Sequence, residues 1–385
     1  MRRSFAALVF VFACGFAAVS ASFAAVPIPK SPSIDARSYL LMDYESGRVL
    51  GENRADERME PASLTKLMTA YGVFKALKEK RLKLSDLVSV SAYATAQEGS
   101  RTYLQKDSQV PADVLIKGMI VQSGNDAAIA LAERVGGSEQ GFVDLMNAYA
   151  KQLHMNTTHF ANANGLPNSN HYSTARDLAV LALGIIREFP EYYKYYGLKE
   201  FTWNNIRQQN RNGLLTRDPS VDGIKTGHTE TAGYCLITSA NRDGMRLVSV
   251  VLGSPSIKGR EDASAALLNY GYTFYETVKI KNRGDTVLKP RVWMSTQEFV
   301  GVGPLQDIVI TVGRGEVASL KTSARVNEPL MAPLSASKAV GELTVSSANG
   351  DIVSRVPLYP LKDVTEGDLM TRLVDKVTLW SERFF

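Results

Sequence analysis

The stretch Pro61-Ala-Ser-Leu-Thr-Lys66 places a serine and a lysine three positions apart near the start of a predicted helix, Pro61–Leu77. Proline is favoured at an early helical position, because its missing N–H would have no partner there. Positions i and i+3 share a helix face, so the Lys66 amine can reach the Ser63 hydroxyl. A neutral amine can accept the hydroxyl proton, and the helix N-terminus stabilises negative charge near the serine. We therefore predict Ser63 as nucleophile and Lys66 as general base.

Lys66 can act as a base only when it is deprotonated, whereas a free lysine has a pKa of about 10.4. Burial and a second nearby cation both lower a lysine pKa. Lys225 is the candidate for that cation, since it belongs to the only Lys-Thr-Gly sequence in the chain, Lys225–Gly227.

A second short motif, Ser123-Gly-Asn125, falls in a predicted turn between two helices, Ala112–Val121 and Ala127–Val135. Short motifs of this kind also occur elsewhere by chance. The other matches are Ser335–Lys338 for S-x-x-K, and Ser239–Asn241 and Ser347–Asn349 for S-x-N. Only Ser63, Ser123 and Lys225 follow one another within a single region of mixed helices and strands, which favours a shared site.

The surrounding elements predict an α/β (α+β) catalytic domain over residues 25–278 and a smaller all-β domain over 279–365. In the first region, apolar patterns of helical and strand type are mixed. After residue 278 only short alternating runs punctuated by Gly and Pro remain. The main predicted elements of the first region are the strands Ala36–Tyr44, Arg48–Leu50, Tyr234–Ala240 and Met245–Leu252 and the helices Ala175–Arg187 and Glu261–Phe274.

The N-terminus has the pattern of an export signal over residues 1–24. Arg2 and Arg3 precede an apolar run, and small residues follow at a plausible cleavage position. An uncleaved membrane anchor is the alternative. Cys14 lies inside this segment, so Cys235 would be the only cysteine of the mature chain, where we expect it in the core rather than as a nucleophile.

The composition excludes several classes of protein. The chain has 385 residues, 45% of them hydrophobic and 22% charged, which fits a globular protein with its own core. The formal net charge is +5 and no block of Lys or Arg stands out, so we expect no nucleic-acid partner. None of the four histidines has the spacing of a metal motif, so we expect no metal and no cofactor.

The last segment, residues 366–385, has the pattern of an amphipathic helix. Its apolar residues recur at three- and four-residue steps. They are Leu369, Met370, Leu373, Val374, Val377, Trp380 and Phe384. One interpretation packs this stripe on the β domain, and the other lays it in a membrane surface, which Trp380 and the terminal Phe384-Phe385 favour. Four acidic residues against three basic ones predict weak attraction to anionic lipid.

The motifs together resemble those of the D-alanyl-D-alanine carboxypeptidases among the low-molecular-mass penicillin-binding proteins. The matching stretches are Pro61–Lys66, Val121–Asp126, Tyr172–Asp177, Asn210–Leu215 and Val221–Thr229. The resemblance covers nearly the whole chain. It implies a penicillin-recognising catalytic domain, a β-sandwich-like stalk, and a tail on the periplasmic face of the cytoplasmic (inner) membrane. Peptidoglycan stem peptides are the implied substrate, and β-lactam antibiotics the implied inhibitors.

The resemblance also implies a role for each site residue. Ser63 attacks the penultimate D-Ala carbonyl, and Lys66 is the base. Ser123 relays a proton to the leaving amine, and Asn125 holds the substrate amide. The backbone N–H groups of Ser63 and of His228, the residue after Gly227, hold the oxyanion. The remaining implied contacts are Lys225 and Thr226 to the terminal carboxylate, with Arg211 and Arg260 supporting Lys225 or that carboxylate.

Three other functions remain open at this level. A class A β-lactamase shares the motifs but needs a Glu that activates water, and the loop Asn156–Asp177 contains none. A D,D-endopeptidase acting on cross-bridges could use the same residues, and a non-catalytic wall-binding protein could keep the fold. His159 and His171 lie in this polar loop, where we expect solvated side chains.

Overall fold

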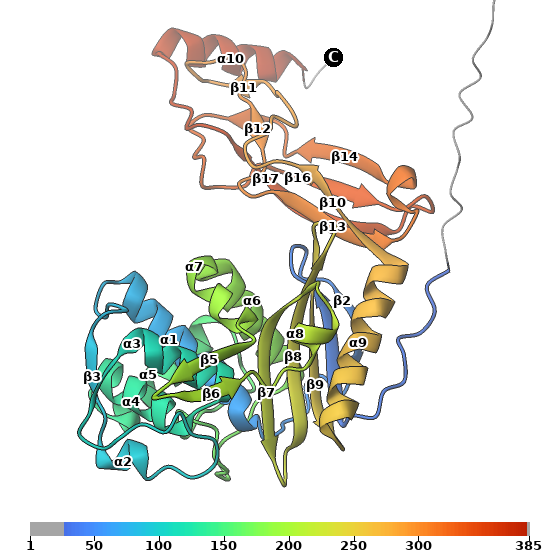
Figure 1. The fold of residues 1–385 in the computed structure, drawn as a ribbon. Coiled ribbons are helices and arrows are strands. Elements are labelled where there is room, and N and C mark those ends of the chain that lie inside the picture. The colour runs from blue at the N-terminus through green and yellow to red at the C-terminus, as the bar shows by residue number, and fades with distance from the viewer. Residues whose placement is uncertain (1–26, 383–385) are drawn as a thin grey trace, which may run out of the picture.

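A five-stranded antiparallel sheet forms the centre of the larger part of the molecule, with strand order β2-β1-β9-β8-β7 (Figure 1). The computed structural model describes residues 27–382. The strands are β1 (Ser38–Asp43), β2 (Val49–Asn53), β7 (Val221–Thr229), β8 (Gly233–Arg242) and β9 (Met245–Ser254). β7 is an edge strand, and it carries the Lys-Thr-Gly sequence.

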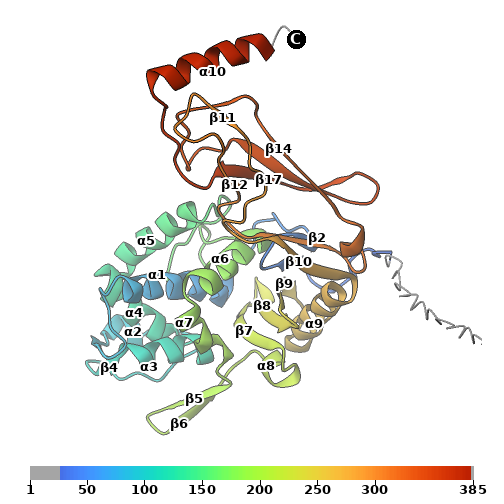
Figure 2. The same ribbon diagram turned by 90° about the horizontal axis from the view of Figure 1, so that it is seen from above.

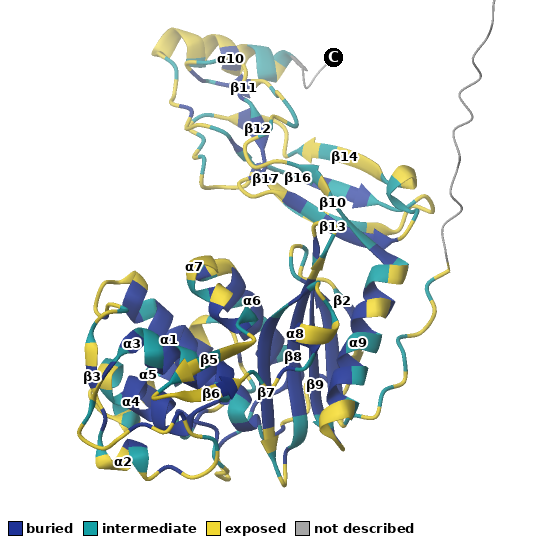
Figure 3. Ribbon diagram, in the orientation of Figure 1, coloured by how far each residue is buried: buried dark blue, intermediate teal, exposed yellow. Residues whose placement is uncertain are grey.

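Both faces of this sheet are covered, which explains the continuous apolar runs of its strands. Along β1 successive side chains alternate between two cores. Tyr39 and Leu41 join a cluster with helix α9 (Ile257–Phe274), whereas Leu40 and Met42 join the larger cluster formed with the helices on the other side. Figure 3 shows the buried strands between these two layers.

The helical half lies beside β7 and contains most of the predicted helices. The helical elements are η1 (Ala62–Thr65), α1 (Lys66–Lys78), α2 (Ala92–Thr95), α3 (Ala112–Lys117), η2 (Gly118–Gln122), α4 (Asn125–Gly136), α5 (Glu139–Gln152), α6 (Ala175–Glu188), α7 (Pro190–Tyr193), η3 (Lys194–Gly197) and α8 (Leu214–Arg217). Two antiparallel hairpins complete it, β3 (Leu87–Ser89) with β4 (Gln109–Pro111) and β5 (Glu200–Trp203) with β6 (Ile206–Gln209). Figure 2 shows the second hairpin projecting from the domain.

Two predicted helices differ from the expectation at functionally interesting places. The helix expected from Pro61 begins as a 3₁₀ turn, η1, and becomes α-helical only at Lys66. The helix expected over residues 112–121 changes into a π-helical turn, η2, immediately before Ser123. Such departures from regular helix are frequent at functional sites.

The smaller part is all β, as the sequence predicts. A four-stranded sheet of order β12-β17-β16-β14 packs with two strand pairs, β10–β13 and β11–β15, around a separate apolar core. The strands are β10 (Tyr275–Lys281), β11 (Val292–Trp293), β12 (Val302–Gly303), β13 (Ile308–Gly313), β14 (Lys321–Val326), β15 (Leu330–Met331), β16 (Gly341–Ser346) and β17 (Ile352–Pro360), with the short turn η4 (Val317–Ser319). β10 follows α9 directly and crosses the expected domain boundary at residue 278. The α/β (α+β) fold with a separate β domain is therefore confirmed.

The last helix, α10 (Leu369–Glu382), lies at the far end of the β domain with its apolar stripe exposed (Figure 1). Leu369 is 77% exposed and Val377 60% exposed. The helix contacts the domain through its polar side instead, because buried Asp375 accepts a hydrogen bond from the Met294 backbone N–H and pairs with Arg291. The interpretation that packs the stripe on the β domain is therefore wrong.

The predicted export signal, residues 1–24, and the terminal residues 383–385 lie outside the described part of the chain. Within residues 27–382, no helix combines the length and the apolar character that crossing a bilayer requires.

Candidate active site

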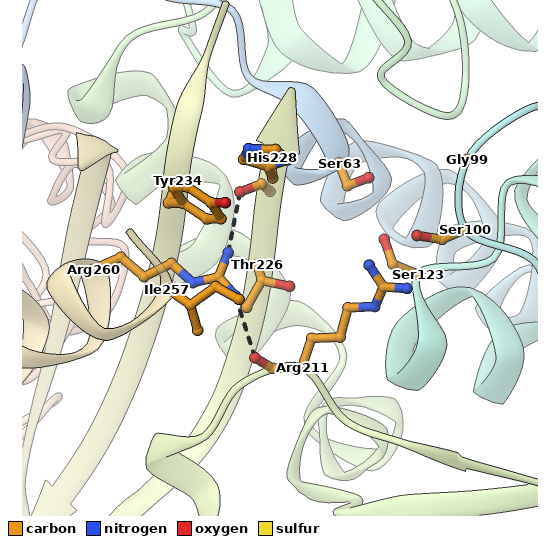
Figure 4. Close-up of a pocket in the computed structure, with 11 residues that line it drawn as sticks. Ser63, Gly99, Ser100, Ser123, Arg211, Thr226, His228, Tyr234, Ile257 and Arg260 are labelled. Atoms are coloured by element: carbon orange, nitrogen blue, oxygen red, sulfur yellow. Dashed lines mark hydrogen bonds between the residues drawn. The ribbon is translucent and has the colours of Figure 1, made fainter. Parts of the chain in front are cut away.

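A cavity of about 700 Å³ opens between strand β7 and the helical half, at the edge of the central sheet (Figure 4). Its walls come from separate regions of the chain: the η1 turn, the loop after α2, the turn before α4, the segment after β6, strands β7 and β8, and the start of α9. The lining residues are Ser63, Gly99, Ser100, Ser123, Arg211, Thr226, Gly227, His228, Tyr234, Ile257 and Arg260. The cavity therefore brings together seven residues predicted from the sequence: Ser63, Ser123, Arg211, Thr226, Gly227, His228 and Arg260.

Ser63 and Lys66 are in direct contact. The Lys66 Nζ donates to Ser63 Oγ at 3.0 Å and to the carbonyl of Asn164 at 2.5 Å. The 3₁₀ geometry of η1 explains the first contact, because positions i and i+3 eclipse each other in such a turn. Ala62, immediately before the serine, has a left-handed φ of 49°, a strained conformation of the kind found at active sites.

The environment of the Lys66 amine suits a base that works at neutral pH. Burial and, to a smaller extent, the Arg211 guanidinium lower the pKa of Lys66 to about 7, although the Asp126 carboxylate opposes both effects. The cation acting on Lys66 is thus Arg211. The expectation that Lys225 supplies this effect is wrong, because the charges that act on Lys66 are those of Arg211 and Asp126.

Lys225 and Ser123 form a second amine–hydroxyl pair. The Lys225 Nζ donates to Ser123 Oγ at 2.9 Å and to the carbonyl of Thr226 at 3.0 Å. Burial and the charges of Lys66, Arg211 and Arg260 lower the pKa of Lys225 well below its ordinary value. Ser123 follows η2 with a left-handed φ of 65°, and this geometry turns its hydroxyl toward the cavity.

Asn125 lies behind the cavity wall rather than on it. Its Nδ2 donates to the carbonyl of Glu98 at 2.5 Å, and its buried Oδ1 has no hydrogen-bond partner. The neighbouring Asp126, which the sequence analysis did not single out, accepts hydrogen bonds from the backbone N–H groups of Thr102 and Leu104. Asp126 thereby fixes the loop that carries Gly99 and Ser100 to the start of α4.

Strand β7 approaches the η1 turn so closely that any side chain at position 227 would require its neighbours to move. A Cβ on Gly227 would lie 3.0 Å from the carbonyl oxygen of Pro61 and 3.3 Å from the backbone nitrogen of Leu64. This close approach places Thr226 and His228 on the wall next to Ser63. The exposed His228 ring stacks on Tyr234, with the ring centroids 4.1 Å apart.

The two predicted arginines differ in their surroundings. Arg211 is exposed, follows the β5–β6 hairpin, and extends its guanidinium across the cavity toward Ser123 (Figure 4). Arg260 is buried in α9 and donates to the backbone carbonyls of Gly227, Cys235 and Arg211. Arg211 is thus placed to meet a ligand, whereas Arg260, which also lines the cavity, connects three backbone segments of its wall.

His171 is buried, so the expectation of a solvated side chain is wrong for this residue. Its Nδ1 accepts from the Ala161 backbone N–H at 3.1 Å, and its Nε2 therefore carries the proton and donates to Thr65 Oγ1 at 2.7 Å. Burial, with the charges of His159 and Lys66, lowers the pKa of His171 to about 4. His171 thus supports the η1 turn as a neutral ring.

The other predictions at single residues are simpler to report. The His159 ring is exposed, as expected, and hydrogen-bonds the carbonyl of Asn170. Cys235 is fully buried next to β7, and burial raises the pKa of its thiol to about 11, which confirms a core residue. Among the described residues, no group of three or more His, Cys, Asp or Glu side chains could hold a metal ion.

A serine–lysine pair, a second serine–lysine pair and a Lys-Thr-Gly edge strand, placed on a sheet covered by helices on both faces, define a penicillin-recognising serine enzyme. Residues 25–256 match the family described as D-alanyl-D-alanine carboxypeptidase, and residues 275–366 match the C-terminal domain of penicillin-binding protein 5. The chain belongs to the D-alanyl-D-alanine carboxypeptidase family, and it is a serine peptidase of this type.

Individual relatives agree with this assignment over almost their full length. The chain is 42% identical to the D-alanyl-D-alanine carboxypeptidase DacA of Escherichia coli K12, over 93% of this chain and 91% of that protein. It is 43% identical to the D-alanyl-D-alanine carboxypeptidase DacC of the same organism, over 94% of this chain and 93% of that protein.

Solved structures also resemble the whole molecule. Penicillin-binding protein 5 of Haemophilus influenzae superposes with a TM-score of 0.85 at 40% identity, covering 88% of this chain and all of that chain. A variant of the Streptomyces K15 DD-transpeptidase, at 30% identity and a TM-score of 0.59, covers 63% of this chain and 100% of its own. The likeness to two-domain structures confirms a family fold that includes the β domain.

Proposed function

We propose that the protein removes the terminal D-alanine from peptidoglycan stem pentapeptides through an acyl-enzyme on Ser63. The observation that carries this proposal is the 3.0 Å contact between Ser63 Oγ and an amine whose pKa lies at about 7. At neutral pH a substantial fraction of Lys66 is uncharged and can accept the hydroxyl proton. Ser63 Oγ then attacks the carbonyl carbon of the penultimate D-alanine.

The backbone N–H groups of Ser63 and His228 stabilise the oxyanion that forms in this step. The close approach of β7 to η1 at Gly227 supports that role, because it brings the segments that carry Ser63 and His228 together on one side of the reacting carbonyl. The C–N bond then breaks, Ser123 passes a proton to the departing amine, and D-alanine leaves. Water then hydrolyses the remaining ester. Ser63 regains its hydroxyl proton, and Lys66 returns to the neutral amine.

The terminal carboxylate of the substrate binds Thr226 and the exposed Arg211 guanidinium. Lys225 acts from behind this wall, where its amine holds Ser123 Oγ at 2.9 Å. An arriving carboxylate raises the pKa of nearby amines, so substrate binding itself favours the charged form of Lys225. Asn125 holds the substrate amide after its own amide has left the carbonyl of Glu98. Arg260 acts as a positioning residue for Gly227.

We further propose that penicillin acylates Ser63 and forms a long-lived adduct. The loop between Asn156 and Asp177 contains no Glu that could activate a deacylating water in the manner of a class A β-lactamase. Family membership supports peptidoglycan as the substrate class and supports the carboxypeptidase over the lactamase.

The proposed organisation of the chain follows the same lines. Residues 1–24 are an export signal, 25–278 the catalytic domain, 279–365 a stalk, and 366–385 a helix that lies in the periplasmic surface of the inner membrane. The two family matches, over 25–256 and 275–366, support the division into domains. The exposed apolar stripe of α10 supports the membrane contact.

A digest of a synthetic stem pentapeptide tests the central proposal. Mass spectrometry should detect free D-alanine and the tetrapeptide, and incubation with penicillin should give a covalent adduct on the peptide that contains Ser63. Ser63→Ala should remove both products while the thermal unfolding midpoint stays close to that of the wild type. An adduct retained in this variant would mean that another serine is the nucleophile, and cleavage of cross-linked dimers alone would favour an endopeptidase.

A further inference from the structure

One corner of the cavity is apolar, whereas the remaining wall is polar. Ile257 lines the cavity and is 55% exposed, although it is a β-branched aliphatic residue. It is the first residue of α9, after Ser256, whose hydroxyl caps the helix by accepting from the Gly259 N–H. A single exposed aliphatic side chain on an open surface is common and does not indicate a binding site. Ile257 differs, because it lines the same cavity as Ser63.

Two rings extend this apolar surface. His228 and Tyr234, which are stacked on each other, line the same cavity as Ile257 (Figure 4). The Arg260 guanidinium lies 5.8 Å from the Tyr234 ring centroid, while its two terminal nitrogens donate to three backbone carbonyls. We call Ile257, Tyr234 and the ring of His228 the apolar corner.

The proposed reaction leaves one substituent of the departing residue without a partner. Its nitrogen must lie between Ser63 and Ser123, and its carboxylate is attracted to Thr226 and Arg211. The side chain of that D-residue is then the group left for the apolar surface. We propose that the apolar corner binds the side chain of the C-terminal D-residue and that Ile257 determines which residues are accepted there. This inference rests on the proposed carboxypeptidase reaction.

The chemistry of the corner predicts the class of residue that it accepts. The cavity of about 700 Å³ holds the whole substrate, and within it the Ile257 side chain is 55% exposed, so a larger apolar D-residue gains contact there. No Asp or Glu lines the cavity, and Arg211 and Arg260 do, so a cationic side chain is repelled. Substrates ending in D-leucine should therefore be cleaved, and substrates ending in D-lysine should be disfavoured.

Three peptides with the same acyl part and the C-terminal residues D-alanine, D-leucine or D-lysine test this inference on the full-length protein. Wild-type kcat/KM for D-leucine should lie within about tenfold of that for D-alanine. Ile257→Ala should lower the D-leucine to D-alanine ratio about tenfold, since the larger side chain loses its contact. Ile257→Glu should raise the D-lysine to D-alanine ratio by about the same factor, because the new carboxylate pairs with the ammonium group.

Ile352→Glu is the matched control, since Ile352 is 52% exposed in the β domain, far along the chain from the cavity. It should leave both ratios at their wild-type values. Formation of the penicillin adduct on Ser63 shows that each variant is folded, and Ile257→Val provides a conservative second substitution that should retain the D-leucine ratio. Ratios that do not move in Ile257→Ala or Ile257→Glu overturn the subsite. If the wild type released no D-alanine at all, the proposed function itself would fail, a result distinguishable from an unchanged ratio.

Discussion

The chemistry of the site depends on the protonation states of two buried amines, which a small number of residues control. Lys66 and Lys225 are both almost fully buried, and each holds one serine hydroxyl. Burial favours the neutral form of both amines, and at Lys225 the charge of Lys66 adds to this effect. Arg211 adds to this effect at Lys66, and it also faces the cavity. One exposed guanidinium can therefore both activate the base and attract the substrate carboxylate.

The pKa of Lys66 predicts the pH dependence of acylation. A group with a pKa of about 7 that must be neutral to act is inactive below that pH, so the acylation rate should rise through pH 7 and then level off. Stopped-flow measurements with a chromogenic penicillin would give this profile. Lys66→Arg should lower the rate by about 10²–10⁴-fold, because a guanidinium stays charged.

Lys78→Arg, at the other end of α1, is the control for the Lys66 substitution and should keep the wild-type profile. A rate that does not vary across neutral pH, or a Lys66→Arg protein that reacts normally, would contradict the assignment of Lys66 as the base.

At the scale of elements, the site depends on the contact between the η1 turn and strand β7. These two elements lie far apart in the sequence and meet where Gly227 passes the backbone of Pro61 and Leu64. The Gly165 backbone packs even more closely on the other side, because a Cβ there would lie 1.9 Å from the carbonyl oxygen of Ala62. The left-handed Ala62 is thus held from two sides, which stabilises a backbone conformation that is unfavourable by itself.

Replacing Gly227 by alanine should therefore disturb catalysis more than folding. The added methyl group would push β7 away from η1 by a few tenths of an ångström, since two of the three nearest atoms, the Pro61 oxygen and the Leu64 nitrogen, are backbone and cannot rotate aside. We expect acylation to slow by about 10²–10³-fold, as when one oxyanion donor is lost, with a small change in the thermal unfolding midpoint. Gly184→Ala in α6 is the control, because its nearest neighbour would lie at an ordinary 3.5 Å. Normal acylation by Gly227→Ala would exclude the tight contact as a requirement.

The helices and strands also show which parts of the structure the sequence patterns predict. Apolar periodicity and the motifs predicted the central strands, the long helices and part of the cavity lining. The lining residues Gly99, Ser100, Tyr234 and Ile257 were missed, because no motif marks them. Local patterns did not predict the 3₁₀ turn at η1 or the π turn before Ser123, since both are imposed by packing against distant segments. The burial of His171 was missed for the same reason, because its ring packs against the η1 turn and hydrogen-bonds Thr65, which lies far from its own polar loop in the sequence.

At the scale of the whole molecule, a polar contact joins the catalytic domain to the β domain. Asp43 at the end of β1 is fully buried and accepts hydrogen bonds from the Ser46 backbone and hydroxyl and from the Thr277 hydroxyl. Thr311 on β13 hydrogen-bonds both of these hydroxyl groups. One carboxylate thus connects the β1–β2 hairpin to strand β10 and, through the threonines, to β13. The arrangement favours a fixed orientation of the two domains.

Removal of this carboxylate should loosen the junction without affecting the site. Asp43→Ala leaves buried donors without an acceptor, so we expect the free energy of unfolding to fall by about 1–3 kcal/mol. Asp43→Asn keeps one acceptor and should lose less. Hydrogen exchange should accelerate in β10 and β13, while penicillin acylation of soluble protein stays at the wild-type rate. Unchanged exchange in β10 would show that the contact does not hold the domains.

The orientation of α10 leads to a prediction about the membrane. Its stripe of apolar side chains faces outward, at the end of the molecule away from the catalytic domain, because Asp375 holds the polar side on the β domain. Insertion of the apolar area should supply the binding energy, since the acidic and basic residues of the segment nearly balance. The full-length protein should therefore float with vesicles of neutral phosphatidylcholine alone. Leu373→Asp with Val377→Asp should reduce this binding at least about tenfold, because two charges would enter the apolar layer.

The same two charges placed at other exposed apolar positions, Leu87→Asp with Ile352→Asp, are the matched control. That protein should bind vesicles like the wild type, since neither position belongs to α10. Cleavage of a soluble pentapeptide should be equal in all three proteins, because the cavity lies in the other domain. Equal vesicle binding by the Leu373/Val377 variant, or binding by the wild type only when anionic lipid is added, would contradict insertion of the stripe as the mode of attachment.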